Sequence, residues 1–451
     1  MKLKEGKEKL DKISSSFCIA KWKQVTIHLE NGLTHSCHHP RVHKIPLDEL
    51  KNNPGALHNT KYKINLRKQM LNNEFIPECE YCNIVECNKN NEKQGIYSDR
   101  IFKSTDSWAW KYKDECITEV ENVYPSYLEV SFSSVCNCTC LYCSPQFSNA
   151  WKKEIEKFGA YKTKDNSKSL KDYSFENTSK DTNPYIKAFW EWWPDVYPHL
   201  HTFRITGGEP LLSNETFKVM DYISKNPKQN FKFNINSNLS ISDELFEKFI
   251  QELKTIKSEV IIFTSNEAYD KKSEYIRVGM NYNKWLKRIK RILKEIPNSK
   301  VSIMAAYNVL SISSFQEFLE DIWKLKNTKI NDKYISKRIL IDVPYITNPR
   351  YLSVNIIDNS FIKYIKENLD FMKSKFIEYS IPGTSKYTPG FEDFEIRGME
   401  RLIPFISEAK NKDSERKDFK IFIDEHDKRY GTTFLEIFPE YREFYEMCGK
   451  I

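Results

Sequence analysis

The sequence has no long apolar run and no internal repeat. Across its 451 residues, apolar stretches such as Val260 to Phe263 are far shorter than the roughly 20 residues that a membrane-spanning helix needs. The N-terminal stretch MKLKEGKEKLDKISSSF is basic and lacks an apolar segment of signal-peptide length. We therefore expect a cytoplasmic protein in a reducing compartment, with no membrane partner.

Charge of one sign is in small excess. The formal net charge is +8, because 70 Lys and Arg residues face 62 Asp and Glu residues. These charges are interspersed, which is typical of a solvated surface, although the excess also suits an acidic protein partner such as a flavodoxin or ferredoxin. We expect no nucleic-acid partner. Hydrophobic residues make up 40% of the chain, enough to build a buried core.

Short strand-like runs alternate with helical periodicity from Tyr127 to Tyr345, a pattern typical of βα units in a parallel sheet. Six strands are predicted at Tyr127–Phe132, His201–Thr206, Phe231–Asn236, Glu259–Thr264, Lys300–Ala306 and Ile339–Tyr345. The predicted helices follow the first strand, lie near Phe217, Phe249 and Trp285, and run from Phe315 to Leu325. Six strands and five helices predict an α/β fold with a partial (β/α)6 barrel, whose working groups lie on loops at the strand C-termini.

The chain is predicted to form three domains, at residues 1–125, 126–350 and 351–451. The first carries six of the eleven cysteines, the second is the barrel and the third is mainly helical. The stretch from Tyr161 to Tyr185 is rich in Lys, Asp, Ser and Asn with little periodicity. It is predicted to be an insertion that serves either as a lid or as a flexible loop.

Three cysteines follow the first predicted strand at the spacing C-x3-C-x2-C: Cys136, Cys140 and Cys143. Thiolates at this spacing can converge on one soft metal centre. A [4Fe-4S] cluster with three protein ligands would keep one iron open for a substrate or cofactor. Because Cys138 makes four thiols available, a zinc site in a non-enzymatic binding module or adaptor is the alternative.

This loop resembles the signature of the radical S-adenosylmethionine (SAM) superfamily, in which an aromatic residue, here Tyr142, precedes the last cysteine. The resemblance implies that SAM binds the open iron. It also implies that the reduced cluster cleaves SAM to a 5′-deoxyadenosyl radical, which abstracts hydrogen from the substrate. The chain would then be an oxidoreductase or modifying enzyme acting on a peptide, a protein or a small molecule.

Later segments resemble the family's SAM-binding motifs in the same order along the chain. Gly207, Gly208 and Glu209 precede a proline, as in the family's GGEP motif, which implies contact with the SAM amino group. The turn from Asn236 to Asn238 stands in the place of the family's Thr-Asn-Gly turn. Since asparagine tolerates positive φ, Asn238 is expected to preserve that turn.

Ser265 and Arg277 are similar to family residues that contact the SAM ribose and carboxylate. Glu267 departs from the family pattern, because aspartate is usual at its position. A weak ion pair on the protein surface is the other interpretation of Arg277.

Four further thiols come from three separated places near the N-terminus: Cys18, Cys37, Cys79 and Cys82. Four thiolates suffice for a complete cluster site. The pattern C-x13-G-x4-C followed by C-x2-C resembles the twitch and SPASM auxiliary-cluster domains, although those usually follow the barrel. The resemblance implies an auxiliary [4Fe-4S] cluster that acts in electron transfer.

Other candidate residues have two interpretations each. A third cluster or simple buried thiols would account for Cys87, Cys116, Cys138 and Cys448. A zinc site or ordinary hydrogen bonding would account for His35, His38, His39 and His43. A pocket lining or a core cluster would account for Trp190, Trp192 and Trp193.

Overall fold

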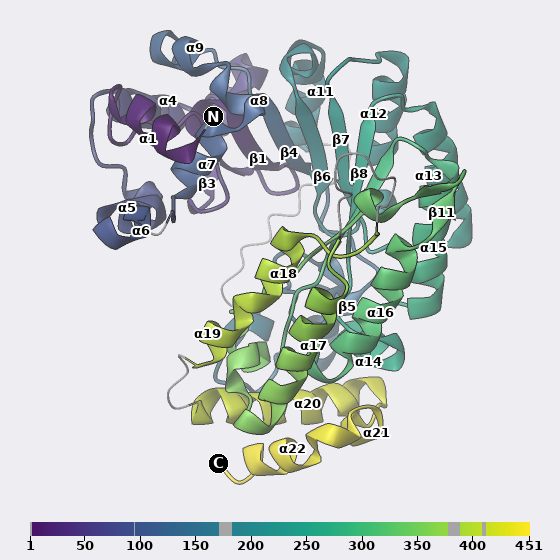
Figure 1. The fold of residues 1–451 in the computed structure, drawn as a ribbon. Coiled ribbons are helices and arrows are strands. Elements are labelled where there is room, and N and C mark those ends of the chain that lie inside the picture. The colour runs from purple at the N-terminus through teal and green to yellow at the C-terminus, as the bar shows by residue number, and fades with distance from the viewer. Residues whose placement is uncertain (1, 94, 171–182, 378–387, 408–411) are drawn as a thin grey trace. The chain divides into compact units, whose positions relative to one another are not determined.

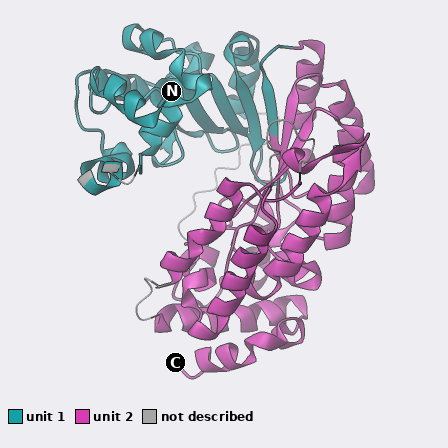
Figure 2. Ribbon diagram, viewed as in Figure 1, with its two compact units in different colours: residues 1–133, 175–210, 228–234 teal, residues 134–174, 211–227, 235–451 magenta. Residues whose placement is uncertain are grey.

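The computed structural model describes residues 2–93, 95–170, 183–377, 388–407 and 412–451, and Figure 1 shows their course. The chain folds into two compact units, coloured separately in Figure 2. Unit 1 consists of Met1–Ser133, Phe175–Pro210 and Lys228–Asn234. Unit 2 consists of Ser134–Ser174, Leu211–Pro227 and Ile235–Ile451. The predicted domain boundaries after residues 125 and 350 stay a prediction.

Unit 1 contains a mostly parallel sheet. Strand β4 (Tyr127–Ser131) pairs in parallel with β6 (Thr202–Thr206) on one side and with β1 (Gln24–His28) on the other. Two short strands, β2 (Leu33–His35) and β3 (His43–Lys44), extend the sheet in antiparallel fashion from β1. The N-terminal region therefore adds a parallel strand next to the first strand of the predicted barrel.

Strand β1 was not among the six predicted strands. Its residues, Gln24 to His28, alternate between polar and apolar, although the first four are all buried in the structure. This alternation and the β-branched Val25, Thr26 and Ile27 are the signals that could have identified the strand.

Unit 2 contains parallel strands at its centre. Strand β10 (Ser299–Met304) pairs in parallel with β8 (Glu259–Ser265) and β13 (Ile339–Asp342). Strand β7 (Lys232–Asn236) begins in unit 1 and ends in unit 2. Further short strands are β5 (Thr139–Cys140), β9 (Arg277–Val278), β11 (Lys329–Ile330) and β12 (Lys333–Tyr334).

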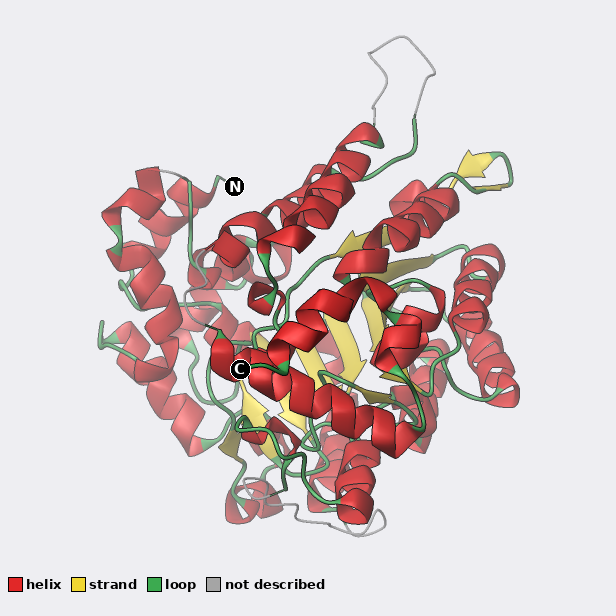
Figure 3. Ribbon diagram, turned by 90° about the horizontal axis from the view of Figure 1, so that it is seen from below, coloured by secondary structure: helices red, strands yellow, loops and turns green. Residues whose placement is uncertain are grey.

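All six predicted strands are present, within a few residues of their predicted bounds, as β4, β6, β7, β8, β10 and β13. The chain is a mixed α/β protein, as predicted, and its longer strands pair in parallel. Figure 3 shows helices around these strands. Closure of the strands into a partial barrel stays a prediction.

Helices make up much of both units. Those of unit 1 are α1 (Leu3–Asp11), α2 (Ala20–Lys23), α3 (Leu47–Asn52), α4 (Lys61–Leu71), α5 (Glu80–Cys87), α6 (Lys89–Lys93), α7 (Asp99–Thr105), α8 (Ser107–Trp110), α9 (Lys113–Thr118) and α11 (Pro184–Val196). Those of unit 2 up to residue 326 are α10 (Asn149–Phe158), α12 (Asn214–Lys225), α13 (Asp243–Thr255), α14 (Asp270–Ile276), α15 (Tyr282–Glu295) and α16 (Phe315–Lys326). The predicted helical C-terminal region contains α17 (Ile362–Ser374), α18 (Asp393–Glu400), α19 (Leu402–Ser407), α20 (Asp413–Tyr430), α21 (Phe434–Ile437) and α22 (Arg442–Cys448).

Hydrophobic spacing explains the predicted helices. In α15, Trp285, Ile289 and Ile292 recur at three- and four-residue intervals and are fully buried, while Asn281 caps the helix by accepting from the Lys284 amide. The tryptophans of α11 fit the core interpretation, since Trp192 and Trp193 are buried. No helix of the described ranges is long and apolar enough to cross a bilayer.

The predicted insertion from Tyr161 to Tyr185 is only partly covered. Residues 171–182 lie outside the described residues, and helix α11 begins at Pro184. Residues 161–170 form a continuous described segment, in which Tyr161 and Lys168 are buried. This part is packed against the protein and is not a loop in solvent.

Candidate functional site

The cysteine loop of unit 2 is held by a short antiparallel ladder. Strand β5 pairs with β9, so that Cys140 lies opposite Arg277. The Leu141 amide continues the ladder by donating to the Ile276 carbonyl oxygen at 2.9 Å. Gly279 follows the ladder with φ of 99°, and a Cβ atom there would lie 2.7 Å from the Asn137 carbonyl oxygen. Glycine therefore permits the close approach of these two backbone segments.

Helix α10 also holds this loop, through hydrogen bonds between its side chains and the loop backbone. The Asn149 side-chain oxygen accepts from the Cys136 amide at 3.0 Å. The buried Trp151 indole donates to the Cys140 carbonyl oxygen at 2.9 Å. Two of the three cysteines of the C-x3-C-x2-C motif are thus fixed through their backbones.

The turn after β7 also contacts the loop. The Asn238 side chain donates to the Asn137 side-chain oxygen at 2.9 Å and to the Cys138 sulfur at 3.5 Å. The residue with positive φ in this turn is Leu239, at 53°, and not Asn238 as expected. Asparagine at position 238 thus supplies a hydrogen-bond donor to the cysteine loop.

The three motif thiols lie near one another. Burial raises the pKa of Cys140 to about 12, Arg277 opposes this shift, and the charges of Cys143 and Cys136 add to it. Burial also raises the pKa of Cys143, against the effect of Lys168. The charges of Cys136 and Cys143 thus act on the Cys140 thiol, and metal binding at these thiols would release protons.

Arg277 is buried, with 4% of its surface exposed, so the interpretation as a surface ion pair does not hold. Its Nη2 lies 2.7 Å from a carboxylate oxygen of the fully buried Glu267, and it also contacts the Tyr142 hydroxyl. Its Nη1 lies 3.5 Å from the Cys140 sulfur. Although burial lowers the pKa of Arg277, the Glu267 carboxylate raises it well above its ordinary value. The longer acid at position 267 thus neutralises the arginine that faces Cys140.

Replacing Glu267 by glutamine should destabilise unit 2 by about 3–5 kcal/mol, because Arg277 would remain as an unpaired buried charge. Urea unfolding of the metal-free protein measures this loss. The exposed pair of Asp393 and Arg397 provides the control, because water screens this pair and Asp393→Asn should therefore cost much less stability. Equal effects of the two substitutions would contradict the buried pairing.

The predicted SAM-contacting residues are divided between the two units. Ser265 is the last residue of β8 in unit 2 and is partly buried. In unit 1, Gly207 directly follows β6 with φ of 117°, and a Cβ atom there would lie 2.6 Å from the Ser133 carbonyl oxygen. The Gly208 amide donates to that oxygen at 3.0 Å, and Glu209 is buried. Glycine at 207 is therefore required by the backbone whether or not this segment contacts a ligand.

The four N-terminal cysteines line one cavity of about 220 Å³ in unit 1. Cys18 lies between two fully buried core residues, Phe17 and Ile19. Cys37 follows β2, Cys79 precedes α5, and Cys82 lies within α5. Residues up to 64 positions apart in the chain thus line one cavity, and their role as a ligand set stays a prediction.

Ion pairs accompany these thiols. The Lys103 ammonium lies 3.7 Å from the Cys37 sulfur and 2.9 Å from an Asp99 carboxylate oxygen, and the Ser104 hydroxyl lies 3.9 Å from the Cys18 sulfur. Lys21, with 3% of its surface exposed, also lines the cavity and forms an ion pair with Glu78. Burial raises the pKa of Cys79 to about 12, Lys21 opposes the shift, and the charges of Cys18, Cys82 and Cys37 add to it. The cavity therefore combines four neighbouring thiols with lysines that are paired with carboxylates.

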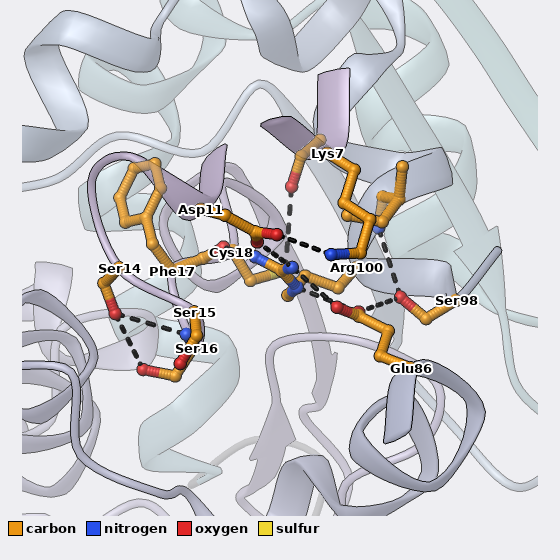
Figure 4. A network of polar contacts seen from close by, with 12 residues as sticks. Lys7, Asp11, Ser14, Ser15, Ser16, Phe17, Cys18, Glu86, Ser98 and Arg100 are labelled. Atoms are coloured by element: carbon orange, nitrogen blue, oxygen red, sulfur yellow. Dashed lines mark hydrogen bonds and ion pairs between the residues drawn. The ribbon is translucent and has the colours of Figure 1, made fainter. Parts of the chain in front are cut away.

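Figure 4 shows the ion-pair network beside Cys18. The Arg100 guanidinium lies 2.6 Å from carboxylate oxygens of both Asp11 and Glu86. It also donates to the Phe17 carbonyl oxygen at 3.0 Å. Because Phe17 directly precedes Cys18, this network fixes the backbone that carries the first thiol.

The remaining candidates are dispersed. Cys116, Cys138 and Cys448 are buried, as expected of simple thiols, and Cys87 is exposed. His39 binds Asp99 at 2.9 Å, and His35 contacts the Cys37 carbonyl oxygen. Among the described side chains, no three Cys, His, Asp or Glu residues are grouped closely enough to hold a single metal ion.

Sequence reasoning missed Lys21, Lys103 and Lys168, the lysines that lie against predicted cysteine ligands. In a chain with many lysines interspersed among acidic residues, nothing in the local sequence distinguishes a buried lysine from a solvated one. Spacing located the thiols, but the neighbours of the thiols come from distant segments.

Comparison with known proteins gives weak similarities. No protein-family model and no curated protein sequence matches the chain. A crystal structure of Streptococcus suis SuiB bound to S-adenosylmethionine is 14% identical, with 80% of this chain and 70% of that chain covered and a TM-score of 0.36. A second crystal structure of Streptococcus suis SuiB is 13% identical, with 78% and 76% covered and a TM-score of 0.29.

Proposed function

We propose that the chain is a radical SAM enzyme whose Cys136, Cys140 and Cys143 hold a [4Fe-4S] cluster. The observation that carries this proposal is the arrangement of the cysteine loop. Its C-x3-C-x2-C thiols are neighbours, and the β5–β9 ladder keeps the buried Arg277 against the middle one. Three sulfur donors suit a cluster that keeps one iron open.

Each residue of this site has a proposed role. The three cysteines supply thiolate ligands, while Trp151 and Asn149 hold their backbones in place. When bound, the cluster supplies the electron that cleaves SAM to a 5′-deoxyadenosyl radical, which abstracts hydrogen from a peptide, protein or small-molecule substrate. From the family resemblance, SAM contacts are assigned to Gly207, Gly208, Glu209, Ser265, Arg277 and Tyr142.

An auxiliary [4Fe-4S] cluster in the N-terminal cavity is the second part of the proposal. Cys18, Cys37, Cys79 and Cys82 line that cavity, and these four thiols support the assignment, since Lys21 and Lys103 are already paired with Glu78 and Asp99. Cluster ligands bind separate irons, so they surround a volume and do not meet at one point. With all four ligands being cysteine, the proposed role of this cluster is electron transfer.

The test is the metal content of the full chain after anaerobic reconstitution, together with electron paramagnetic resonance before and after SAM is added. We expect about eight irons per chain and a cluster signal that SAM perturbs, because one iron of the first cluster is open. Stoichiometric zinc without iron would refute the proposal and favour a zinc-binding module. A cluster signal unaffected by SAM would refute the assignment of the open iron.

A further inference from the structure

The segment 161–170, called the strap below, is fastened to the C-terminal helix α20. The backbone amides of Lys164 and Asp165 donate to the Asp418 carboxylate at 2.7 and 2.9 Å. The Arg429 guanidinium lies 3.7 Å from the centre of the Tyr161 ring and pairs with Glu154 at 2.9 Å. The side chains of Arg429, Glu154 and Tyr161 are all buried, so the strap has a fixed place in unit 2.

The strap brings Lys168 to the cysteine loop. Lys168 is 1% exposed, and its ammonium contacts the carbonyl oxygen of Cys143. The same ammonium lies 3.8 Å from the centre of the Trp151 ring, a cation–π contact. Trp151 in turn donates to the Cys140 carbonyl oxygen. Lys168 and Trp151 therefore contact each other and the backbone carbonyl oxygens of two predicted cluster ligands, Cys143 and Cys140.

Lys168 differs from Arg277 in the groups that contact its positive charge. Arg277 is neutralised by its ion pair with Glu267. The contacts of the Lys168 ammonium are a carbonyl oxygen and an aromatic face, and among the described residues no carboxylate contacts it. The charges of Glu154 and Asp165 act on the ammonium without contacting it, and a negatively charged group at the cysteine loop would stabilise this buried cation further.

We infer that Lys168 is a positioning residue for the cluster of Cys136, Cys140 and Cys143, and that its charge raises the reduction potential of that cluster. The inference rests on the proposed function. Reduction adds one negative charge to the cluster, and a nearby buried cation stabilises the reduced form more than the oxidised form. The C-terminal helix has an indirect part in this effect, because Asp418 and Arg429 hold the strap that carries the lysine.

The inference is tested by substituting Lys168 in a full chain that also carries Cys79→Ala, so that the cluster of the Cys136 loop gives the remaining signal. Lys168→Met removes charge and hydrogen bond, Lys168→Gln retains a donor without charge, and Lys168→Arg retains the charge. Lys164→Met is the matched control, because Lys164 lies in the same strap with an exposed side chain. Iron is counted first, and the midpoint potential is then measured by a redox titration followed by electron paramagnetic resonance.

We expect Lys168→Met and Lys168→Gln to shift the reduction equilibrium about tenfold toward the oxidised form, which is about 59 mV lower for one electron. Lys168→Arg and Lys164→Met should leave the potential unchanged. An unchanged potential in Lys168→Gln, or an equal fall in Lys168→Arg, would overturn the inference even if Lys168→Met did not fold. Absence of iron from the unaltered chain would instead refute the proposed function, so the two failures are distinguishable.

Discussion

Cys140→Ala should abolish SAM cleavage, with a fall of more than about 100-fold, since even the outer partners of metal ligands cost about 10–100-fold when removed. Cys140 lies half-buried in strand β5 opposite Arg277, and loss of water around its sulfur raises its pKa in the absence of metal. Without its sulfur, two motif thiols remain, too few to hold a cluster with one open iron. The measurement is formation of 5′-deoxyadenosine from SAM by anaerobically reconstituted protein under reducing conditions.

Cys138→Ala is the matched control for this prediction. Cys138 lies two residues away in the same loop and is buried, but it falls inside the C-x3-C spacing. Its sulfur accepts a hydrogen bond from Asn238, so the substitution tests general damage to the loop. Loss of cleavage in Cys138→Ala with retention in Cys140→Ala would mean that the ligand set has been assigned wrongly.

Cys79→Ala should remove about four of the eight expected irons and leave the SAM-perturbed signal in place. Cys79 lines the N-terminal cavity with Cys18, Cys37 and Cys82. Three thiolates would remain after its loss, but unlike the Cys136 site this one is proposed to have no small-molecule ligand for the fourth iron. The measurement is iron and sulfide content, with the electron paramagnetic resonance spectrum recorded on the same samples. Loss of the auxiliary cluster alone is the expected result, because the two proposed ligand sets share no residue.

Cys87→Ala is the control for the auxiliary site. Cys87 is the last residue of helix α5, which also carries Cys82, but its exposed thiol bonds to Asn83 and does not line the cavity. Its removal should leave about eight irons per chain. A full iron content in Cys79→Ala, or an equal loss in Cys87→Ala, would contradict the assignment of the cavity as the cluster site.

The six predicted strands and the helices between them were predictable because their signals are local. Alternating apolar residues in β4 and the recurring large side chains of α15 are signals within a few positions of the chain. Strand β1 carries the same alternation over five residues and was missed. The strand is defined by its pairing with β4, about a hundred residues later in the chain.

Of the two candidate sites, only the cysteine ligands were predictable from the sequence. Spacing and family resemblance selected the seven cysteines. The structure places four of them around one cavity, and in the cysteine loop the charges of Cys136 and Cys143 act on the Cys140 thiol. The partners of Arg277 were expected to be at the surface or on SAM, yet the structure pairs this residue with Glu267 in the interior. A charge pattern along the chain contains no information about burial, so this outcome needed the fold.

The sequence by itself determined where the chain forms strands and helices and which thiols are spaced as a ligand set, because both depend on residues close together in the chain. Only the tertiary structure decided which charges accompany those thiols. Lys168 meets Cys143 across 25 residues, and the strap that carries it is held in part through Glu154 and Arg429, which are 275 residues apart. Such contacts form only when distant elements pack together, and this packing determines which lysine is buried and which stays in solvent.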